Sequence, residues 1–173
     1  STLTDDVELT AENLAVSKIA VSSDQLEEMT QTSWHLEIHD ETCYRNPNTG
    51  WLTGTGTFLT LELVNARPTD YSFLPDGTYT VDGEPTTDPE TGLQQYRIPA
   101  VVAGKYTRPG FYGASSFVRY EEGTETEGTG IYGGTVTVSR EGDVYTLVFD
   151  LKDDAENTIS GTYTGTITEY VVQ

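Results

Sequence analysis

Apolar and polar residues alternate along the C-terminal part of the chain, and this alternation restricts the fold more than any other feature. In "GTVTVSREGDVYTLVFDLKDDAENTISGTYTGTI" (134–167), Val136 and Val138 share one face, as do Tyr145, Leu147 and Phe149. Successive side chains of a β-strand point to opposite faces, so a period of two indicates strands with one face in a core. Mostly polar turn segments at 140–143 and 153–157 interrupt the pattern. We therefore predict three consecutive antiparallel strands joined by tight turns.

The same period occurs earlier in the chain. It is clear in "SWHLEIHD" (33–40) and "GTFLTLELVNA" (56–66), and shorter strands are expected within 14–23, 78–81 and 111–120. The apolar residues that share the inward face of these strands are the predicted core: Trp34, Leu36, Ile38, Leu59, Leu61, Leu63, Val136, Val138, Tyr145, Leu147, Phe149, Ile159, Tyr163 and Ile167.

These strands predict a single all-β domain over residues 14–173, with roughly eight to ten antiparallel strands in a two-sheet β-sandwich. A calycin-like β-barrel is the alternative, because regular turn spacing does not separate the two architectures. Residues 1–13 are polar and acidic, which is typical of a flexible leader. "SSDQLEEMTQ" (22–31) predicts one short helix, since Ser22 and Gln25 have capping-box spacing. "EEGTETEGTG" (121–130) is predicted to be a flexible acidic loop.

The element Gly-Thr-Tyr-Thr occurs twice, at 77–80 and at 161–164. In a strand, Tyr79 and Tyr163 point away from their flanking threonines. We expect each ring to be buried at the rim of a sheet, with its hydroxyl bonded to water or to a backbone carbonyl. The functional alternative is a row of exposed Tyr and Trp rings that stack on sugar faces. The first interpretation makes the element part of the scaffold.

The charge of the chain excludes several partners. It has 28 acidic residues against nine Lys and Arg, a formal charge of −19. Nucleic acids and anionic lipid surfaces are recognised by clustered basic side chains, so neither is an expected partner. Apolar runs long enough to cross a membrane do not occur, so the domain is not expected to insert into one. Cys43 has no second cysteine to pair with and is expected to be a buried thiol.

The motifs for catalysis and metal binding are weak. His35 and His39 flank Glu37, but in a strand their spacing spreads the two imidazoles along one face. The acidic segments 82–92 and 150–158 lack the ligand order of an EF-hand, and turn chemistry explains them. Carboxylate pairs for glycoside hydrolysis can be chosen freely among so many acidic residues, which singles out none. We predict no enzyme, no catalytic residue, no metal and no cofactor.

The segments "LPDGTYTV" (74–81) and "GGTVTVSREGDVYTLVFDLKDDAENTISGTYTG" (133–165) resemble a pattern of uncharacterised surface or periplasmic lipoproteins of the Bacteroidetes. In that family, strands beginning Gly-Thr-Val-Thr-Val and Gly-Thr-Tyr-Gly recur in all-β domains. The resemblance implies an extracytoplasmic protein at the outer membrane surface or in the periplasm, with the acidic leader as a tether to an N-terminal lipid anchor. It brings no catalytic residues.

Together these observations predict a non-catalytic binding or adhesion module for a glycan or another surface protein. A carrier of a small apolar ligand inside a barrel is the alternative, and a glycoside hydrolase is the third hypothesis. Aromatic residues in or beside Gly- and Pro-rich loops are the candidate ligand contacts: Tyr44, Trp51, Tyr106, Phe111 and Tyr112.

Overall fold

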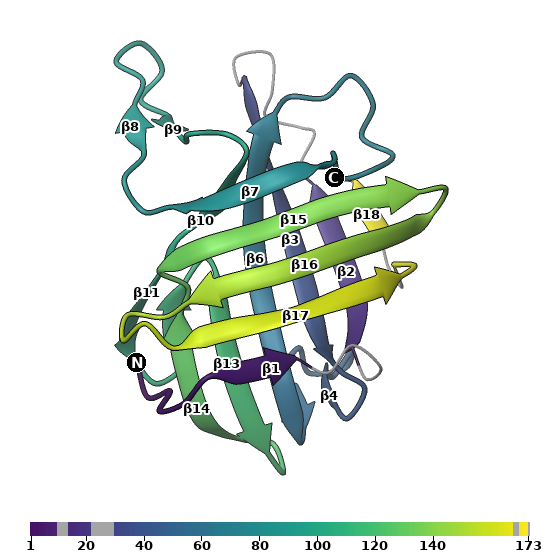
Figure 1. Cartoon of the computed structure of the whole chain (residues 1–173), viewed down its shortest axis with the longest axis vertical. Helices are drawn as coiled ribbons and strands as arrows, with labels where there is room; N and C mark the ends of the chain where they lie inside the picture. Colours follow the sequence, from purple (N-terminus) through teal and green to yellow (C-terminus); the bar gives the residue numbers. More distant parts are fainter. Residues whose placement is uncertain (10–13, 22–29, 168–169, 173) are drawn as a thin grey trace.

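The predicted alternation produces strands in two stacked layers (Figure 1). The computed structural model describes residues 1–9, 14–21, 30–167 and 170–172, with side chains described for 1–9 and 30–167. The layer at the front of Figure 1 contains β7 (Gly77–Asp82), β15 (Gly133–Glu141), β16 (Val144–Lys152), β17 (Thr158–Gly165) and β1 (Val7–Leu9). The layer behind it contains β14 (Thr124–Gly130), β13 (Ser116–Glu121), β6 (Gly56–Ala66), β3 (Gln31–Asp40), β2 (Leu14–Val21) and β18 (Tyr170–Val172).

The two layers belong to one hydrogen-bonded sheet. Its path is β1-β17-β16-β15-β7-β10-β6-β3-β2-β18, and the β13–β14 hairpin branches from β6. Strand β10 (Ala100–Val102) connects the layers, because it pairs with β7 on one side and with β6 on the other. The expected pair of separate sheets is therefore one sheet folded over itself, and the alternative of a closed barrel is wrong.

The sheet is mixed rather than antiparallel. Strands β1 and β17, β7 and β10, and β2 and β18 pair in parallel. Hairpin signals predict antiparallel neighbours that follow one another along the chain, whereas these three pairs join strands separated by other elements. The prediction of a wholly antiparallel arrangement is wrong for this reason.

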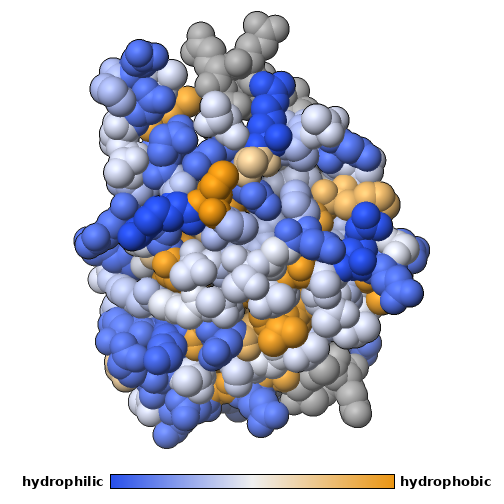
Figure 2. Space-filling model, turned by 45° about the horizontal axis from the view of Figure 1, so that its top comes forward, coloured by the Kyte–Doolittle hydropathy of each residue, from blue (hydrophilic) through white to orange (hydrophobic). Residues whose placement is uncertain are grey.

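The predicted core is confirmed, and it lies between the layers. Thirteen of the 14 predicted core residues are buried, and Ile167 packs against them while half-buried. Leu74, Phe117 and Ile131 are also buried in this core. The outer surface seen in Figure 2 carries small hydrophobic patches among hydrophilic and intermediate residues.

The Gly-Thr-Tyr-Thr elements are part of the scaffold, as predicted. Both lie in strands of the front layer, β7 and β17, and both tyrosine rings are buried. The Tyr79 hydroxyl donates to the Pro75 carbonyl over 2.6 Å, and the Tyr163 hydroxyl donates to the Thr166 carbonyl. Each hydroxyl thus satisfies a backbone acceptor at the rim of the layer.

The expected flexible leader is wrong for residues 1–9. Val7 and Leu9 of β1 are buried, and so is Leu3. Asp6 Oδ1 accepts the Thr158 N–H over 2.8 Å, and Thr2 exchanges three hydrogen bonds with Gly128 of the rear layer. The acidic residues of this segment stay at the surface while its three apolar residues enter the core. Residues 10–13 lie outside the described part of the chain.

Two further expectations concern the local structure. The short helix predicted within 22–31 falls mostly on residues 22–29, which lie outside the described residues. The acidic loop predicted at 121–130 is wrong, because residues 124–130 form β14. Strand β14 pairs with β13, and the buried ring of Phe117 in β13 lies in the main core.

Within the described residues, three small hairpins lie outside the main sheet. They are formed by β4 (Cys43–Arg45) with β5 (Leu52–Gly54), β8 (Thr86–Thr87) with β9 (Gln94–Gln95), and β11 (Gly104–Arg108) with β12 (Phe111–Gly113). They contribute most of the surface features described below.

Candidate functional site

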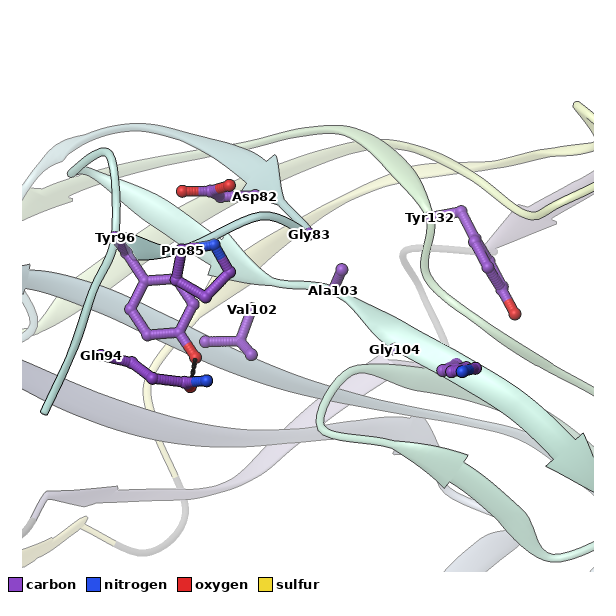
Figure 3. A pocket seen from close by; sticks show the side chains of 10 residues that line it. Asp82, Gly83, Pro85, Gln94, Tyr96, Val102, Ala103, Gly104 and Tyr132 are labelled. Carbon is purple, nitrogen blue, oxygen red and sulfur yellow. Dashed lines mark hydrogen bonds between the residues drawn. The ribbon is translucent and has the colours of Figure 1, made fainter. Parts of the chain in front are cut away.

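A hollow of about 470 Å³ lies between the β8–β9 hairpin and the segment that runs from β10 into β11. Figure 3 shows Tyr96, Pro85 and Gln94 together at one end and Tyr132 at the other, with Ala103 and Gly104 between them. The lining residues are Asp82, Gly83, Pro85, Gln94, Tyr96, Val102, Ala103, Gly104, Lys105 and Tyr132.

A second hollow of about 290 Å³ continues from the first over the outer face of the rear layer. The two share Gln94, Tyr96 and Val102. The second is also lined by Ser33 of β3 and Glu62 of β6. We call the two hollows together the β10 groove.

Tyr96 is held in place by its backbone and by its hydroxyl. The side-chain amide of Gln31 donates to the Tyr96 carbonyl and accepts from the Tyr96 N–H, both over 2.9 Å. This pair of bonds attaches the segment after β9 to the first residue of β3. The Tyr96 hydroxyl donates to Gln94 Oε1 over 3.0 Å (Figure 3). The half-buried ring therefore has a defined position in the groove.

Asp82 fixes the loops around the same groove. Its buried carboxylate accepts the Glu84 N–H over 3.0 Å and the Arg97 N–H over 2.9 Å. The Arg97 guanidinium also donates to Oδ1 over 2.6 Å. These hydrogen bonds hold the pKa of Asp82 well below its usual range, and the bond from the Arg97 guanidinium contributes most. Asp82 is thus a charged residue with a structural role.

Gly104 allows β11 to dock closely beside the sheet. A Cβ at this position would lie 1.9 Å from the Ser115 carbonyl oxygen and 2.7 Å from the Tyr112 carbonyl oxygen. Any larger residue would push the hairpin away from β13 and β14. The close approach sets the position of Lys105, the next residue in the groove lining.

A charged network borders the groove on the rear layer. His35 Nδ1 lies 2.9 Å from Glu62 Oε1, and His35 Nε2 lies 3.6 Å from Glu37 Oε1. Arg45 donates to the same Glu37 oxygen over 2.9 and 3.0 Å. The adjacent carboxylates of Glu37 and Glu62 raise the pKa of His35 to about 9, so this imidazole is protonated at neutral pH. Burial alone would raise the pKa of Glu37, but His35 and Arg45 lower it.

The predicted ligand contacts lie on two hairpins that partly cover the outer face of the rear layer. Trp51 is 77% exposed, Phe111 54% and Tyr44 45%, whereas Tyr112 is buried. Tyr112 packs with Cys43, Phe58 and Val118 in a second, smaller core. The rings of Tyr106 and Tyr112 stack 5.6 Å apart.

Tyr112 therefore braces the β11–β12 hairpin and presents no free ring to a ligand. Trp51, Phe111 and Tyr44 are accessible. Tyr106 adjoins the β10 groove, because its backbone N–H donates to the Tyr132 hydroxyl over 2.9 Å. The buried thiol of Cys43 is as predicted, and burial raises its pKa to about 11.

The groove residues Gln94, Tyr96, Lys105 and Tyr132 were not among the predicted contacts. They lie in segments without strand periodicity, and the long-range bonds of Gln31 to Tyr96 and of Asp82 to Arg97 fix the position of the segment after β9. Their one signal in the sequence is a polar and aromatic composition beside turns, which many surface loops share.

Within the described residues, no group of three or more His, Cys, Asp or Glu side chains is placed to hold a metal ion. His39, one of the two histidines considered for metal binding, stacks on Phe58 with centroids 5.4 Å apart. None of the described segments forms a helix long and apolar enough to cross a membrane.

Comparison with protein-family models, curated proteins and solved structures gave no match. The resemblance to Bacteroidetes lipoproteins therefore stays an expectation from sequence pattern, and no family is assigned.

Proposed function

We propose that this protein is a non-catalytic binding module that holds a saccharide in the β10 groove, on a cell surface or in the periplasm. The observation that carries the proposal is the combination of Tyr96 and Tyr132 with the side-chain amide of Gln94 in one open groove. Ligand sites are typically concave, with volumes of about 300–1,000 Å³, and the main hollow falls in this range.

The chemistry of this lining suits a sugar. A pyranose ring has an apolar C–H face and a rim of hydroxyl groups. An aromatic side chain with a polar tip can cover the first and hydrogen-bond to the second. Amide groups such as Gln94 donate and accept, which matches a hydroxyl that does both.

The groove is already formed by the folded protein itself. Tyr96 is bonded through its backbone to Gln31 and through its hydroxyl to Gln94. A ring held in this way loses little freedom when a ligand binds, so less of the interaction energy is spent on ordering. A groove open at the surface also accommodates a chain longer than itself.

The hairpin aromatics are a second candidate surface for the same function. Trp51, Phe111 and Tyr44 are the accessible members of the predicted set, and the Arg108 guanidinium lies 4.0 Å from the Phe111 ring centroid. They project from two separate hairpins, and the groove has the more enclosed geometry.

The other two hypotheses find less support. The space between the layers is filled by the core side chains described above, which argues against an enclosed apolar ligand. A carboxylic general acid needs a raised pKa. The described carboxyls with displaced pKa values are Glu37, Asp70 and Asp82, and each pKa is lowered.

The test is titration of the protein with a panel of soluble oligosaccharides by calorimetry, with two single variants. Tyr96→Ala is expected to weaken binding at least tenfold, which corresponds to about 1.4 kcal/mol. Trp51→Ala, which removes a more exposed ring outside the groove, is the matched control and is expected to leave the affinity unchanged. Loss of binding in Trp51→Ala alone would place the site on the hairpins. Absence of binding across the panel would refute the proposal.

A further inference from the structure

The β10 groove differs in charge from the protein around it. The chain carries 28 acidic and nine basic side chains, so an average surface hollow should contain unpaired carboxylates. The carboxylates that line the groove are Asp82 and Glu62, and each is paired. Asp82 holds the Arg97 guanidinium, and Glu62 accepts from Ser33 over 2.7 Å and lies against His35.

Lys105 also lines the groove, and it has no such partner. Its side chain is exposed, and within the described residues it forms no ion pair or ring contact. Other described cations are engaged: Arg45, Arg97, Arg119 and Lys152 pair with carboxylates, and Arg108 and Arg140 lie over aromatic rings. Once Arg97 and His35 are counted as the partners of Asp82 and Glu62, the Lys105 ammonium is the charge of the groove lining that has no opposite charge beside it.

We infer that the β10 groove selects saccharides that carry a carboxylate or sulfate group, which the Lys105 ammonium binds. The inference rests on the proposed function, since it names the class of saccharide. Tyr96 and Gln94 at one end of the hollow contact the sugar ring, while the anionic group lies toward Lys105 and Tyr132 at the other.

The net charge of −19 does not prevent this interaction. At physiological ionic strength, exposed charges more than about 8 Å apart are largely screened, so the contacting groups decide the local preference. Asp82 and Glu62 are the carboxylates that line the groove, and their partners offset their negative charge. A charge-assisted hydrogen bond from an ammonium to a carboxylate or sulfate is roughly twice as strong as a neutral one.

The test compares matched pairs of ligands that differ in charge alone. Suitable pairs are oligogalacturonate with its methyl ester, a sialylated oligosaccharide with the methyl ester of its sialic acid, and sulfated carrageenan oligosaccharides with their desulfated forms. Each pair is titrated against the unaltered protein, Lys105→Met, Lys105→Arg and Lys152→Met. Lys152 pairs with Glu156 outside the groove, so Lys152→Met controls for the loss of one positive charge.

The expected result is that the unaltered protein binds the charged member of at least one pair about tenfold more tightly, or 1.4 kcal/mol. Lys105→Met should remove this preference and leave the affinity for the neutral member unchanged. Lys105→Arg and Lys152→Met should retain the preference.

Two results would overturn the inference and leave the proposed function standing: equal affinity for both members of every pair, or a preference that persists in Lys105→Met. Failure to bind any member of any pair, together with failure across the neutral panel, would refute the proposed function and the inference with it.

Discussion

Replacement of Gly161 by alanine tests the close packing between the N-terminal segment and β17. The residue pairs with Leu9 of β1 in the parallel register. A Cβ built at Gly161 would lie 2.8 Å from both the Cβ and the carbonyl oxygen of Leu9. Glycine is needed here because the neighbouring backbone occupies the space that a side chain would fill.

The cost can be worked from this distance. Carbon atoms in favourable contact lie about 3.5–4.0 Å apart, so a 2.8 Å approach requires β1 to move by roughly 0.7–1.2 Å. Overpacking of this kind costs about 1–3 kcal/mol. Alanine also restricts the unfolded chain, which offsets about 0.4–1 kcal/mol. Taken at the middle of each range, these figures give an expected net loss of stability of about 1.3 kcal/mol. Detachment of β1 would instead expose Val7 and Leu9, at about 1.5–3 kcal/mol each.

The assay is equilibrium unfolding in urea, followed by the fluorescence of buried Trp34. Gly133→Ala is the matched control, because the same addition in β15 meets only the Lys152 Cβ at 3.9 Å. We expect the control to be neutral or slightly stabilising. If Gly161→Ala were as stable as the unaltered protein and behaved like Gly133→Ala, the close approach of β1 to β17 would be refuted.

Two further changes test the scaffold and the charged network. Tyr79→Phe keeps the buried ring but leaves the Pro75 carbonyl without its donor, so the free energy of unfolding in urea should fall by about 1–2 kcal/mol; an unchanged value would contradict the role of that hydroxyl. The pKa of His35 is raised from 6.5 to about 9 in the folded state, so its contribution is complete below pH 6.5 and is lost as pH rises through 9. Urea unfolding between pH 6 and 9.5 should therefore show a fall in stability that is smaller in His35→Gln, and equal slopes in the two proteins would show that the imidazole is not held in its charged form.

The sequence predicts most of the core because a period of two in hydrophobicity shows which residues of a strand face inward. In β3 and β6, alternate residues such as Trp34, Leu36 and Leu61 are apolar over a long run, so the inward face can be identified without knowing the partner strand. The two Gly-Thr-Tyr-Thr elements are predictable for the same reason. A buried tyrosine next to a turn needs a nearby acceptor, and a backbone carbonyl provides it.

The parallel pairs could not be predicted in the same way. Strand β1 has three residues, so its alternation is too short to distinguish from chance, and four acidic residues within 1–12 favour a disordered segment. Its stability comes from the edge of β17 and from the core space that Leu3, Val7 and Leu9 fill. These are properties of the assembled sheet. The pairing of β10 with both β6 and β7 also depends on how the sheet turns from one layer to the other.

The groove was missed for a related reason. The predicted contacts were chosen as aromatics beside Gly- and Pro-rich turns, a rule that does not separate the exposed Trp51 from the buried Tyr112. That difference arises because Tyr112 crosses the hairpin toward Cys43 and Phe58. Tyr96 lines the hollow because Gln31 binds its backbone, and Lys105 lines it because Gly104 docks closely beside the sheet. Neither contact produces a periodic pattern in the sequence.

The place of the groove in the fold follows from the way the single sheet turns from one layer to the other. Strand β10 has three residues and is shared by β7 and β6, while β13 pairs with the remaining part of the same β6 edge. The short strand leaves the ends of β7 and β6 without a full-length neighbour, and the β8–β9 hairpin lies beside this corner (Figure 1). At the opposite side, the N-terminal segment joins the layers through β17 and Gly128. The corner is therefore built from paired backbone, and the ligand that we propose for the groove would contact residues of both layers without requiring the core to open.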